Sequence, residues 1–175
     1  MNMFKTIRLA TLSLALAAAA LVQAESVSGT ENAAANADPA QESRYAKQKV
    51  VYHINGYGAK EQTAALRNIQ NHINAVGAGN LDLKVVLHGD GLSLLLEPDG
   101  LEGTKMKEAN ADHEMQARIS GLKEQGVAFD VCANTVKGRK VSTDNLYDFS
   151  DADMVPSGVA ELAQLQIQGY TYIKP

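Results

Sequence analysis

The chain has 175 residues, with 16 Lys and Arg against 20 Asp and Glu, which gives a formal net charge of −4. This acidic balance argues against nucleic acid or an anionic membrane surface as the main partner. The chain has one cysteine, Cys132, so an internal disulfide and a paired-cysteine redox enzyme are both excluded.

The N-terminus has the three parts of a secretory signal peptide. Lys5 and Arg8 precede an uncharged apolar stretch over residues 9–22, and Ala24 supplies the small residue before a cleavage site. A membrane-spanning helix needs roughly 20 apolar residues, and this stretch is shorter. We therefore expect residues 1–24 to be a cleaved signal peptide. The mature protein would then be exported, to the periplasm in a Gram-negative cell, with no membrane attachment after cleavage.

Residues 25–48 are polar and rich in Ala, Asn, Ser and Glu, and Val27 is their only large aliphatic side chain. Such a segment cannot bury enough apolar surface to offset the entropy of ordering it, so we expect a flexible polar linker. Residues 49–175 have the size of one ordinary domain. The predicted organisation is therefore a signal peptide, a linker and a single domain.

From residue 49 onward, β-branched runs alternate with stretches of helical period. Predicted strands cover residues 49–54, 81–88, 127–133, 152–155 and 170–173. Helical spacing predicts three longer helices, which carry the apolar sets Leu66, Ile69, Ile73 and Val76; Met115, Ile119 and Leu122; and Val159, Leu162 and Leu165. This alternation predicts an α/β fold in which helices cover both faces of a mostly parallel sheet.

The segments between these elements carry weaker signals. We expect Asn110 to cap the second helix, and Pro156 with Ser157 to open the third. The stretch GDGLSLLLE is predicted to form a short buried helix, and its apolar part packs either in the core or against another subunit. A basic loop is expected over residues 134–140, and a short helix near residues 143–146.

Ligands of open parallel sheets bind beyond the carboxyl ends of the strands. Three of the predicted strands lead into the polar segments HINGYG, HGDG and CANT, which should therefore share one rim. The catalytic candidates on this rim are Cys132, His53 and His88. The ligand-binding candidates are Asn55, Gly56, Gly89, Asp90, Asn134, Lys137 and Arg139.

Cys132 is predicted at a strand end, before a turn whose backbone N–H groups can point at the sulfur. Lys137, Arg139 and Lys140 follow a few residues later. Both features lower the pKa of a thiol, and a nucleophile or sulfur carrier needs the thiolate. The alternative is that Cys132 is an inert core residue, since free cysteine is among the most buried residue types.

Four histidines require an interpretation. His53 and His88 are predicted beside the thiol, where either could act as a proton shuttle or as a cation next to the thiolate. Alternatively, each caps a strand end or bonds a backbone carbonyl. His72 and His113 fall within predicted helices, and we expect both on the surface.

A metal site is a second hypothesis for the rim. His53, His88, Cys132 and Asp90 could supply nitrogen, sulfur and oxygen ligands to zinc or copper. No Cys-x-x-Cys or His-x-x-x-His pair supports such a site, so we expect no metal and no other cofactor.

At these residues the chain resembles the DsrE/DsrF-like family of sulfur-oxidation proteins. The matching segments are HINGYG, VVLHGDG, GVAFDVCANT and VPSGVAELAQLQIQGYTYIKP, and the likeness runs from about residue 49 to the C-terminus. It implies a three-layer α/β/α sandwich around a five-stranded sheet, and association into small homo- or hetero-oligomers. In the sulfur-relay members, a cysteine carries sulfane sulfur as a persulfide. By its place in the motif, Cys132 would inherit this role.

The resemblance predicts an exported sulfur carrier with, at most, sulfurtransferase-type activity. Its partners would be further copies of the chain and a sulfur donor or acceptor, which is either a protein or a small sulfur compound. The relay members are cytoplasmic, so the predicted export is a departure from them. The alternative function is a non-catalytic oligomeric module that binds a small molecule or a metal.

Overall fold

Within residues 44–175, five strands form one sheet in the order β4-β3-β2-β1-β5, and every neighbouring pair is parallel. The computed structural model describes residues 44–175, so the predicted signal peptide and most of the predicted linker lie outside the described residues. The strands are β1 (Gln48–Ile54), β2 (Leu81–Leu87), β3 (Ala128–Cys132), β4 (Met154–Val155) and β5 (Thr171–Ile173). The five-stranded parallel sheet predicted for this chain is confirmed.

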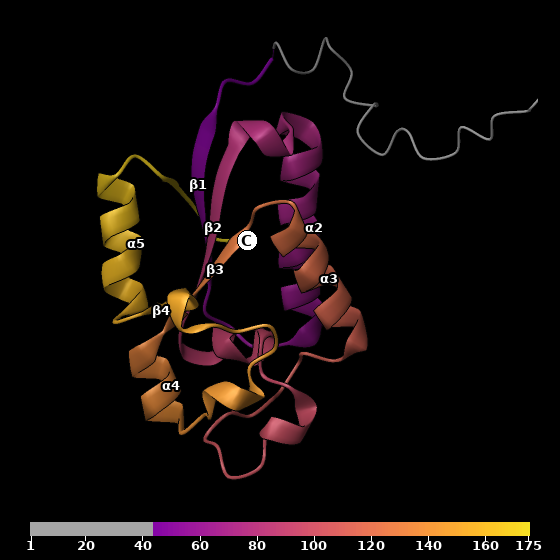
Figure 1. Cartoon of the computed structure of the whole chain (residues 1–175), viewed down its shortest axis with the longest axis vertical. Helices are drawn as coiled ribbons and strands as arrows, with labels where there is room; N and C mark the ends of the chain where they lie inside the picture. The colour runs from indigo at the N-terminus through magenta and orange to yellow at the C-terminus, as the bar shows by residue number, and fades with distance from the viewer. Residues whose placement is uncertain (1–43) are drawn as a thin grey trace, which may run out of the picture. The chain divides into compact units, whose positions relative to one another are not determined.

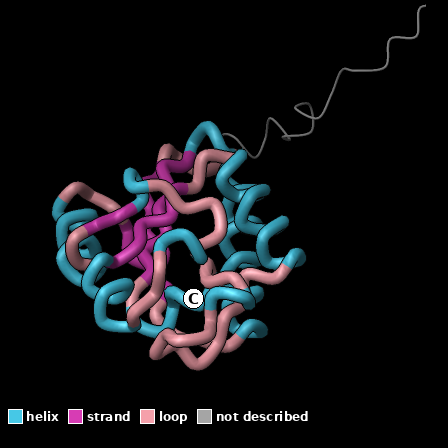
Figure 2. The backbone as a smooth tube through the Cα atoms, turned by 60° about the horizontal axis from the view of Figure 1, so that its bottom comes forward, coloured by secondary structure: helices cyan, strands magenta, loops and turns pink. Residues whose placement is uncertain are grey.

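Helices cover both faces of the sheet, as Figures 1 and 2 show. The longer helices are α2 (Ala59–Val76), α3 (His113–Glu124) and α5 (Gly158–Ile167), and the short helix α4 (Ala133–Arg139) follows β3 directly. Helices α2 and α3 lie on one face, and α5 lies on the other (Figure 1). Within residues 44–175, no helix combines the length and apolar character that crossing a bilayer requires.

The two faces of the sheet bury different amounts of apolar surface. Side chains alternate between faces along each strand, so residues of one parity pack under α2 and α3 while the others pack under α5. The larger core contains Phe129, Leu66, Ile69 and Ile119, all almost fully buried. The smaller core under α5 consists of Val51, Val86, Leu162, Leu165 and Tyr170.

The apolar stretch after β2 belongs to the larger core. It forms the 3₁₀ helix η2 (Gly89–Leu94), and Leu92, Leu94, Leu95 and Leu96 are all at most 2% exposed. Gly91 lets η2 lie directly on the end of β1, because a Cβ there would come within 2.0 Å of the Ile54 carbonyl oxygen. Of the two predicted alternatives for this stretch, the structure therefore shows packing within the chain.

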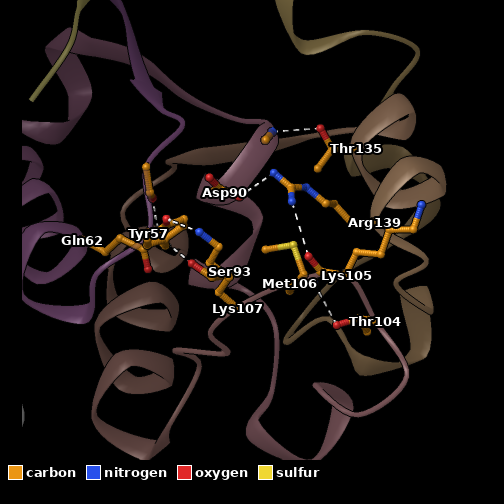
Figure 3. Close-up of polar contacts among 12 residues, drawn as sticks. Tyr57, Gln62, Asp90, Ser93, Thr104, Lys105, Met106, Lys107, Thr135 and Arg139 are labelled. Carbon is orange, nitrogen blue, oxygen red and sulfur yellow. Dashed lines mark hydrogen bonds and ion pairs between the residues drawn. The ribbon is translucent and has the colours of Figure 1, made fainter.

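Three buried polar side chains hold the loops around η2 together. The Gln62 amide donates to the Gly56 carbonyl at 2.9 Å and to the Ser93 hydroxyl at 2.8 Å (Figure 3). Asn110 donates to Gln62 Oε1 at 2.9 Å. Because buried polar groups are costly when unpaired, this network fixes the loop before α2 against the long segment before α3.

Two local predictions were wrong. Residues 133–139 form helix α4 instead of a basic loop. Helix α3 is capped by Asp112, whose carboxylate accepts the Met115 N–H, and not by Asn110. In addition, Val159 lies in α5 as predicted, but its side chain is 65% exposed and does not share the buried face of Leu162 and Leu165.

Candidate functional site

The alternation of side chains along each strand places the three candidate catalytic residues on the same face of the sheet. His53 lies two residues beyond Val51 on β1, and His88 lies two residues beyond Val86 at the end of β2, so both belong to the α5 side of the sheet. Cys132 is the last residue of β3 and packs against Gly158 of α5. Strands β1, β2 and β3 are neighbours in the sheet, which brings the three side chains to one corner of its carboxyl edge.

A pocket of about 480 Å³ opens at this corner. Its walls include the side chains of Cys132, His88, Asn134, Ser157, Lys105 and Arg139. Cys132 is 4% exposed, so the thiol lies at the base of the pocket and not on its rim. A small molecule that enters the pocket therefore meets the sulfur in a largely desolvated position.

The surroundings of Cys132 lower the pKa of its thiol. Burial alone would raise this pKa, but hydrogen bonding from the Thr135 hydroxyl and from the backbone amides of Gly158, Thr135 and Asn134 outweighs burial. These amides belong to the first turns of α4 and α5, whose free N–H groups stabilise negative charge. The site thus favours the thiolate.

Thr135 is held in place by Gly89. The Gly89 N–H donates to the Thr135 hydroxyl oxygen at 2.9 Å (Figure 3). A hydroxyl has a single proton, so an oxygen that accepts from Gly89 still has that proton to donate to the Cys132 sulfur. Gly89 has a φ of 57°, a left-handed conformation that side chains other than glycine rarely adopt.

Gly158 brings α5 into contact with both His88 and Cys132. A Cβ on Gly158 would lie 2.9 Å from the His88 Cβ and 3.3 Å from the Cys132 Cβ. The first of these is closer than real side chains approach, so only glycine fits without movement. The absent side chain therefore allows the start of α5 to direct its amide at the thiol.

His53 and His88 form a stacked pair, with Nε2 atoms 2.7 Å apart and ring centroids separated by 4.7 Å. Burial is the main cause that lowers the pKa of each, and the Lys174 ammonium lowers both further. The pKa of His53 falls to about 4, with a contribution from His88. Both imidazoles are therefore neutral near neutral pH, which favours a proton-shuttle role over a cationic one.

The histidine pair continues to Tyr172 on β5. The Tyr172 hydroxyl lies 2.6 Å from His53 Nδ1. Each neutral imidazole carries one N–H, so the contacts from Tyr172 through His53 to His88 form a single chain in which every bond has one donor. Such a chain can move a proton away from the Cys132 pocket.

The rim predicted from the sequence is divided into two pockets. Asn55 and Gly56 line a separate pocket of about 170 Å³ together with His53, Tyr57 and Lys174. Cys132, His88, Asn134 and Arg139 line the larger one. The contact between the two histidines is the link between these pockets.

Three further residues that were predicted to bind a ligand do not line either of these two pockets. Asp90 forms an ion pair with Arg139, with Oδ1 and Nη2 2.5 Å apart (Figure 3). Gly89 acts through Thr135, and Lys137 is exposed on α4. The predicted backbone N–H groups of the turn after Cys132 are among the causes that lower its pKa, through Asn134 and Thr135, whereas the basic side chains are not among the leading causes.

The alternative metal site would combine His53, His88, Cys132 and Asp90. Within residues 44–175, no three His, Cys, Asp or Glu side chains are arranged to hold a metal ion. Asp90, one of the four proposed ligands, is instead paired with Arg139.

The sequence model of the DsrE/DsrF-like family matches residues 48–175. The chain belongs to the DsrE/DsrF-like family. No curated protein matches the sequence.

Two solved structures resemble this DsrE/DsrF-like chain. A protein of unknown function from Methanobacterium thermoautotrophicum is 26% identical with a TM-score of 0.58. The ychN protein from E. coli is 27% identical with a TM-score of 0.52. Each alignment covers 73% of this chain and 99% of the other. The likeness supports the three-layer α/β sandwich described above.

One buried charge lies near the DsrE/DsrF-like site. Asp130 is 6% exposed on β3, two residues before Cys132 and on the same face. Its Oδ2 lies 3.6 Å from Lys84 Nζ and has no hydrogen-bond partner in the part of the chain that the structure describes. Burial raises the pKa of Asp130, Lys84 opposes this, and Glu161 adds to it.

His72 is not simply a surface residue. It is half-buried on α2, with Nδ1 3.1 Å from the Tyr52 hydroxyl and Nε2 2.8 Å from Gln48 Oε1. His113 is exposed at the start of α3, as predicted.

Sequence reasoning missed four residues of the site. Thr135 and Gly158 stabilise the thiolate, Lys105 lines the pocket, and Tyr172 contacts the histidine pair. Thr135 lies one helical turn after Cys132. Its position beside the thiol could therefore be predicted only if residues 133–139 had been recognised as a helix. Gly158 directly follows the predicted start of α5. Lys105 lies in a long segment without periodicity, where no local pattern indicates its position.

Proposed function

We propose that this DsrE/DsrF-like protein carries sulfane sulfur as a persulfide on Cys132. The observation that carries the proposal is the convergence of the amides of Asn134, Thr135 and Gly158 on the Cys132 sulfur, which lowers the thiol pKa. Family membership supports it, because the sulfur-relay members hold sulfur on a cysteine at the matching motif.

The proposed transfer is a thiol exchange without net oxidation. The Cys132 thiolate attacks the outer sulfur of a donor R–S–SH, a new S–S bond forms on Cys132, and the donor S–S bond breaks. The donor thiolate R–S⁻ leaves with the bonding electron pair. Sulfane sulfur keeps its oxidation state, so no oxidant or reductant is needed. Delivery to an acceptor thiolate is the same step in reverse order.

His88 is the proposed proton acceptor for the Cys132 thiol. It lines the same pocket, packs on the same glycine as Cys132, and is neutral near neutral pH. A neutral imidazole can take the thiol proton, and its contact with His53 offers a path for the charge. His53 then acts through His88 as a positioning residue.

The deciding experiment weighs the intact protein after anaerobic exposure to polysulfide. We expect the mass of one additional sulfur atom on the wild type, removed by a reducing thiol, and none on Cys132→Ser. Addition to Cys132→Ser at the wild-type level would show that the sulfur is held elsewhere. An unreactive wild-type thiol would refute the proposal.

The low exposure of Cys132 is the observation that favours the second candidate, a binding or assembly module without chemistry. In that case the thiol is a packed residue, and its replacement by serine or alanine leaves oligomer size and ligand binding unchanged. The polysulfide experiment separates the two functions, because only the carrier gains sulfur on Cys132, and size-exclusion chromatography with light scattering of the wild type and Cys132→Ala then shows whether the assembly survives without the thiol. The chromatography also tests the homo-oligomer expected from the family.

Export is proposed from residues 1–24 alone. The expected mature chain begins after Ala24 and is found in the periplasmic fraction. The mass of the protein purified from that fraction checks the cleavage point. Recovery of the uncleaved chain from the cytoplasm would refute export while leaving the chemistry of Cys132 open to the test above.

A further inference from the structure

The Cys132 pocket is positively charged in a chain that is negative overall. Lys105 and Arg139 are part of its walls, and among residues 44–175 no Asp or Glu side chain lines it. The whole chain, by contrast, has a formal net charge of −4. The positive charge at the pocket is therefore a local feature that composition does not predict.

The two cations are held together by the backbone. The Lys105 N–H donates to the Arg139 carbonyl at 2.8 Å, and Arg139 Nη1 donates to the Lys105 carbonyl at 3.3 Å (Figure 3). Asp90 orients the guanidinium by accepting from Nη2. Two segments far apart in sequence, the one before α3 and the end of α4, are thereby fixed at one side of the pocket.

The charges do not cancel at the pocket. The Asp90 carboxylate balances one positive charge, because it forms an ion pair with Arg139. Among residues 44–175, no carboxylate forms an ion pair with Lys105, whose side chain is exposed. Lys174, which lines the neighbouring pocket, is a third cation close enough to lower the pKa of His88. The field in the pocket therefore attracts a negative ligand.

We propose that the sulfur compound exchanging with Cys132 is a small anion, whose negative group is bound by Lys105 and Arg139 while its sulfane sulfur faces the thiol. This rests on the proposed sulfur-carrier function. With thiosulfate as donor, the Cys132 thiolate attacks the outer sulfur, the S–S bond of thiosulfate breaks, and sulfite leaves with the electron pair. With an anionic organic persulfide, the leaving group is the organic thiolate.

In both cases negative charge builds up on the leaving group as the donor bond breaks. Fixed cations that face this charge stabilise the transition state more than the free reactants, because they need no reorganisation. The same cations hold the donor in one orientation, with its charged end away from Cys132. An uncharged donor is neither oriented by these cations nor stabilised by them in the transition state to the same extent.

The test compares loading of Cys132 by three donors: thiosulfate, glutathione persulfide as an anionic organic donor, and an uncharged alkyl persulfide. Intact mass gives the rate of loading at several donor concentrations. The key variants are Lys105→Gln and Arg139→Gln. Lys105→Gln disturbs the structure less, because Lys105 forms its hydrogen bonds to Arg139 with backbone atoms only and the substitution keeps those atoms. The matched control is Arg67→Gln, which removes one exposed positive charge from α2 on the opposite face of the sheet.

We expect Lys105→Gln and Arg139→Gln each to reduce the preference for an anionic over the uncharged donor by roughly threefold to tenfold. Added salt should reduce the wild-type preference in the same direction, because these cations are partly exposed. Arg67→Gln should keep the wild-type preference. Loading by thiosulfate alone would identify the inorganic source, and loading by glutathione persulfide alone would identify the organic one.

Three outcomes would overturn this inference. If both variants slow all donors equally, the cations do not select for charge, although the carrier function stands. If Cys132 accepts sulfur only from a persulfide carried by another protein, the donor is not a small anion. If no donor loads Cys132 in the wild type, the proposed function itself fails.

Discussion

The hydroxyl of Thr135 provides the most direct test of the thiolate site. Its oxygen accepts the Gly89 N–H at 2.9 Å, and its proton is directed at the Cys132 sulfur. Thr135→Val keeps the shape of the side chain and removes this donor. A hydrogen bond to a charged group contributes about 1.5–3 kcal/mol. Because 1.4 kcal/mol is a factor of ten, the thiolate population below the pKa should fall roughly 10- to 100-fold.

The assay is the pH dependence of Cys132 alkylation by iodoacetamide, which reacts with the thiolate. We expect the profile of Thr135→Val to move to higher pH, and Thr135→Ser to restore the wild-type profile. Valine also leaves the Gly89 N–H without its acceptor, which costs about 1 kcal/mol of stability. Urea unfolding must therefore show that the variant is folded. A folded valine variant with the wild-type alkylation profile would refute the role of the hydroxyl.

Gly158→Ala should destabilise the protein by about 1–3 kcal/mol in urea unfolding, because the new Cβ meets His88. It should also slow alkylation of the Cys132 thiol. A variant with wild-type stability and alkylation rate would contradict the close approach of α5 to His88. Tyr172→Phe should lower the free energy of unfolding by about 1 kcal/mol and change the tautomer signals of His53 in nitrogen NMR spectra, whereas unchanged signals would show that the hydroxyl does not orient the ring. Burial raises the folded pKa of Asp130 above its ordinary 3.8, so the native state binds the proton more tightly and stability falls as pH rises through this range. Asp130→Asn should therefore gain stability relative to the wild type between acid and neutral pH in urea titrations, and a constant difference would count against this reasoning.

The sequence predicted the fold and the centre of the site because both depend on regular patterns. His53, His88 and Cys132 lie at or next to the carboxyl ends of three strands that are neighbours in the sheet, so their approach follows from strand order and parity. The buried runs of β1, β2 and β3 could be recognised locally for the same reason. The pattern does not predict which side chains beyond the strand ends point into the same pocket. Asn55 and Gly56 turn towards a second pocket, and that direction is set by loop packing.

The errors have identifiable physical causes. Helix α4 has the sequence ANTVKGR, in which Gly138 and two β-branched residues disfavour a helix, so tertiary contacts such as the Gly89–Thr135 bond have to compensate. Asn110 and Asp112 are equally good capping residues by type. Asn110 is instead used by the buried network with Gln62, a partner 48 residues earlier in the chain that local reasoning does not find.

The unequal faces of the sheet explain how one small domain can keep a thiol and two histidines of lowered pKa at its edge. Groups that favour charge or need polar partners destabilise the layer in which they are buried. The three site residues Cys132, His53 and His88 lie on the α5 side, where the apolar core is the smaller of the two and where Asp130 is also buried. The opposite side has an extensive apolar core under α2 and α3, which also includes the segment after β2. Parity along the strands keeps the two sets apart, so the polar site does not interrupt the core on which the stability of the fold depends.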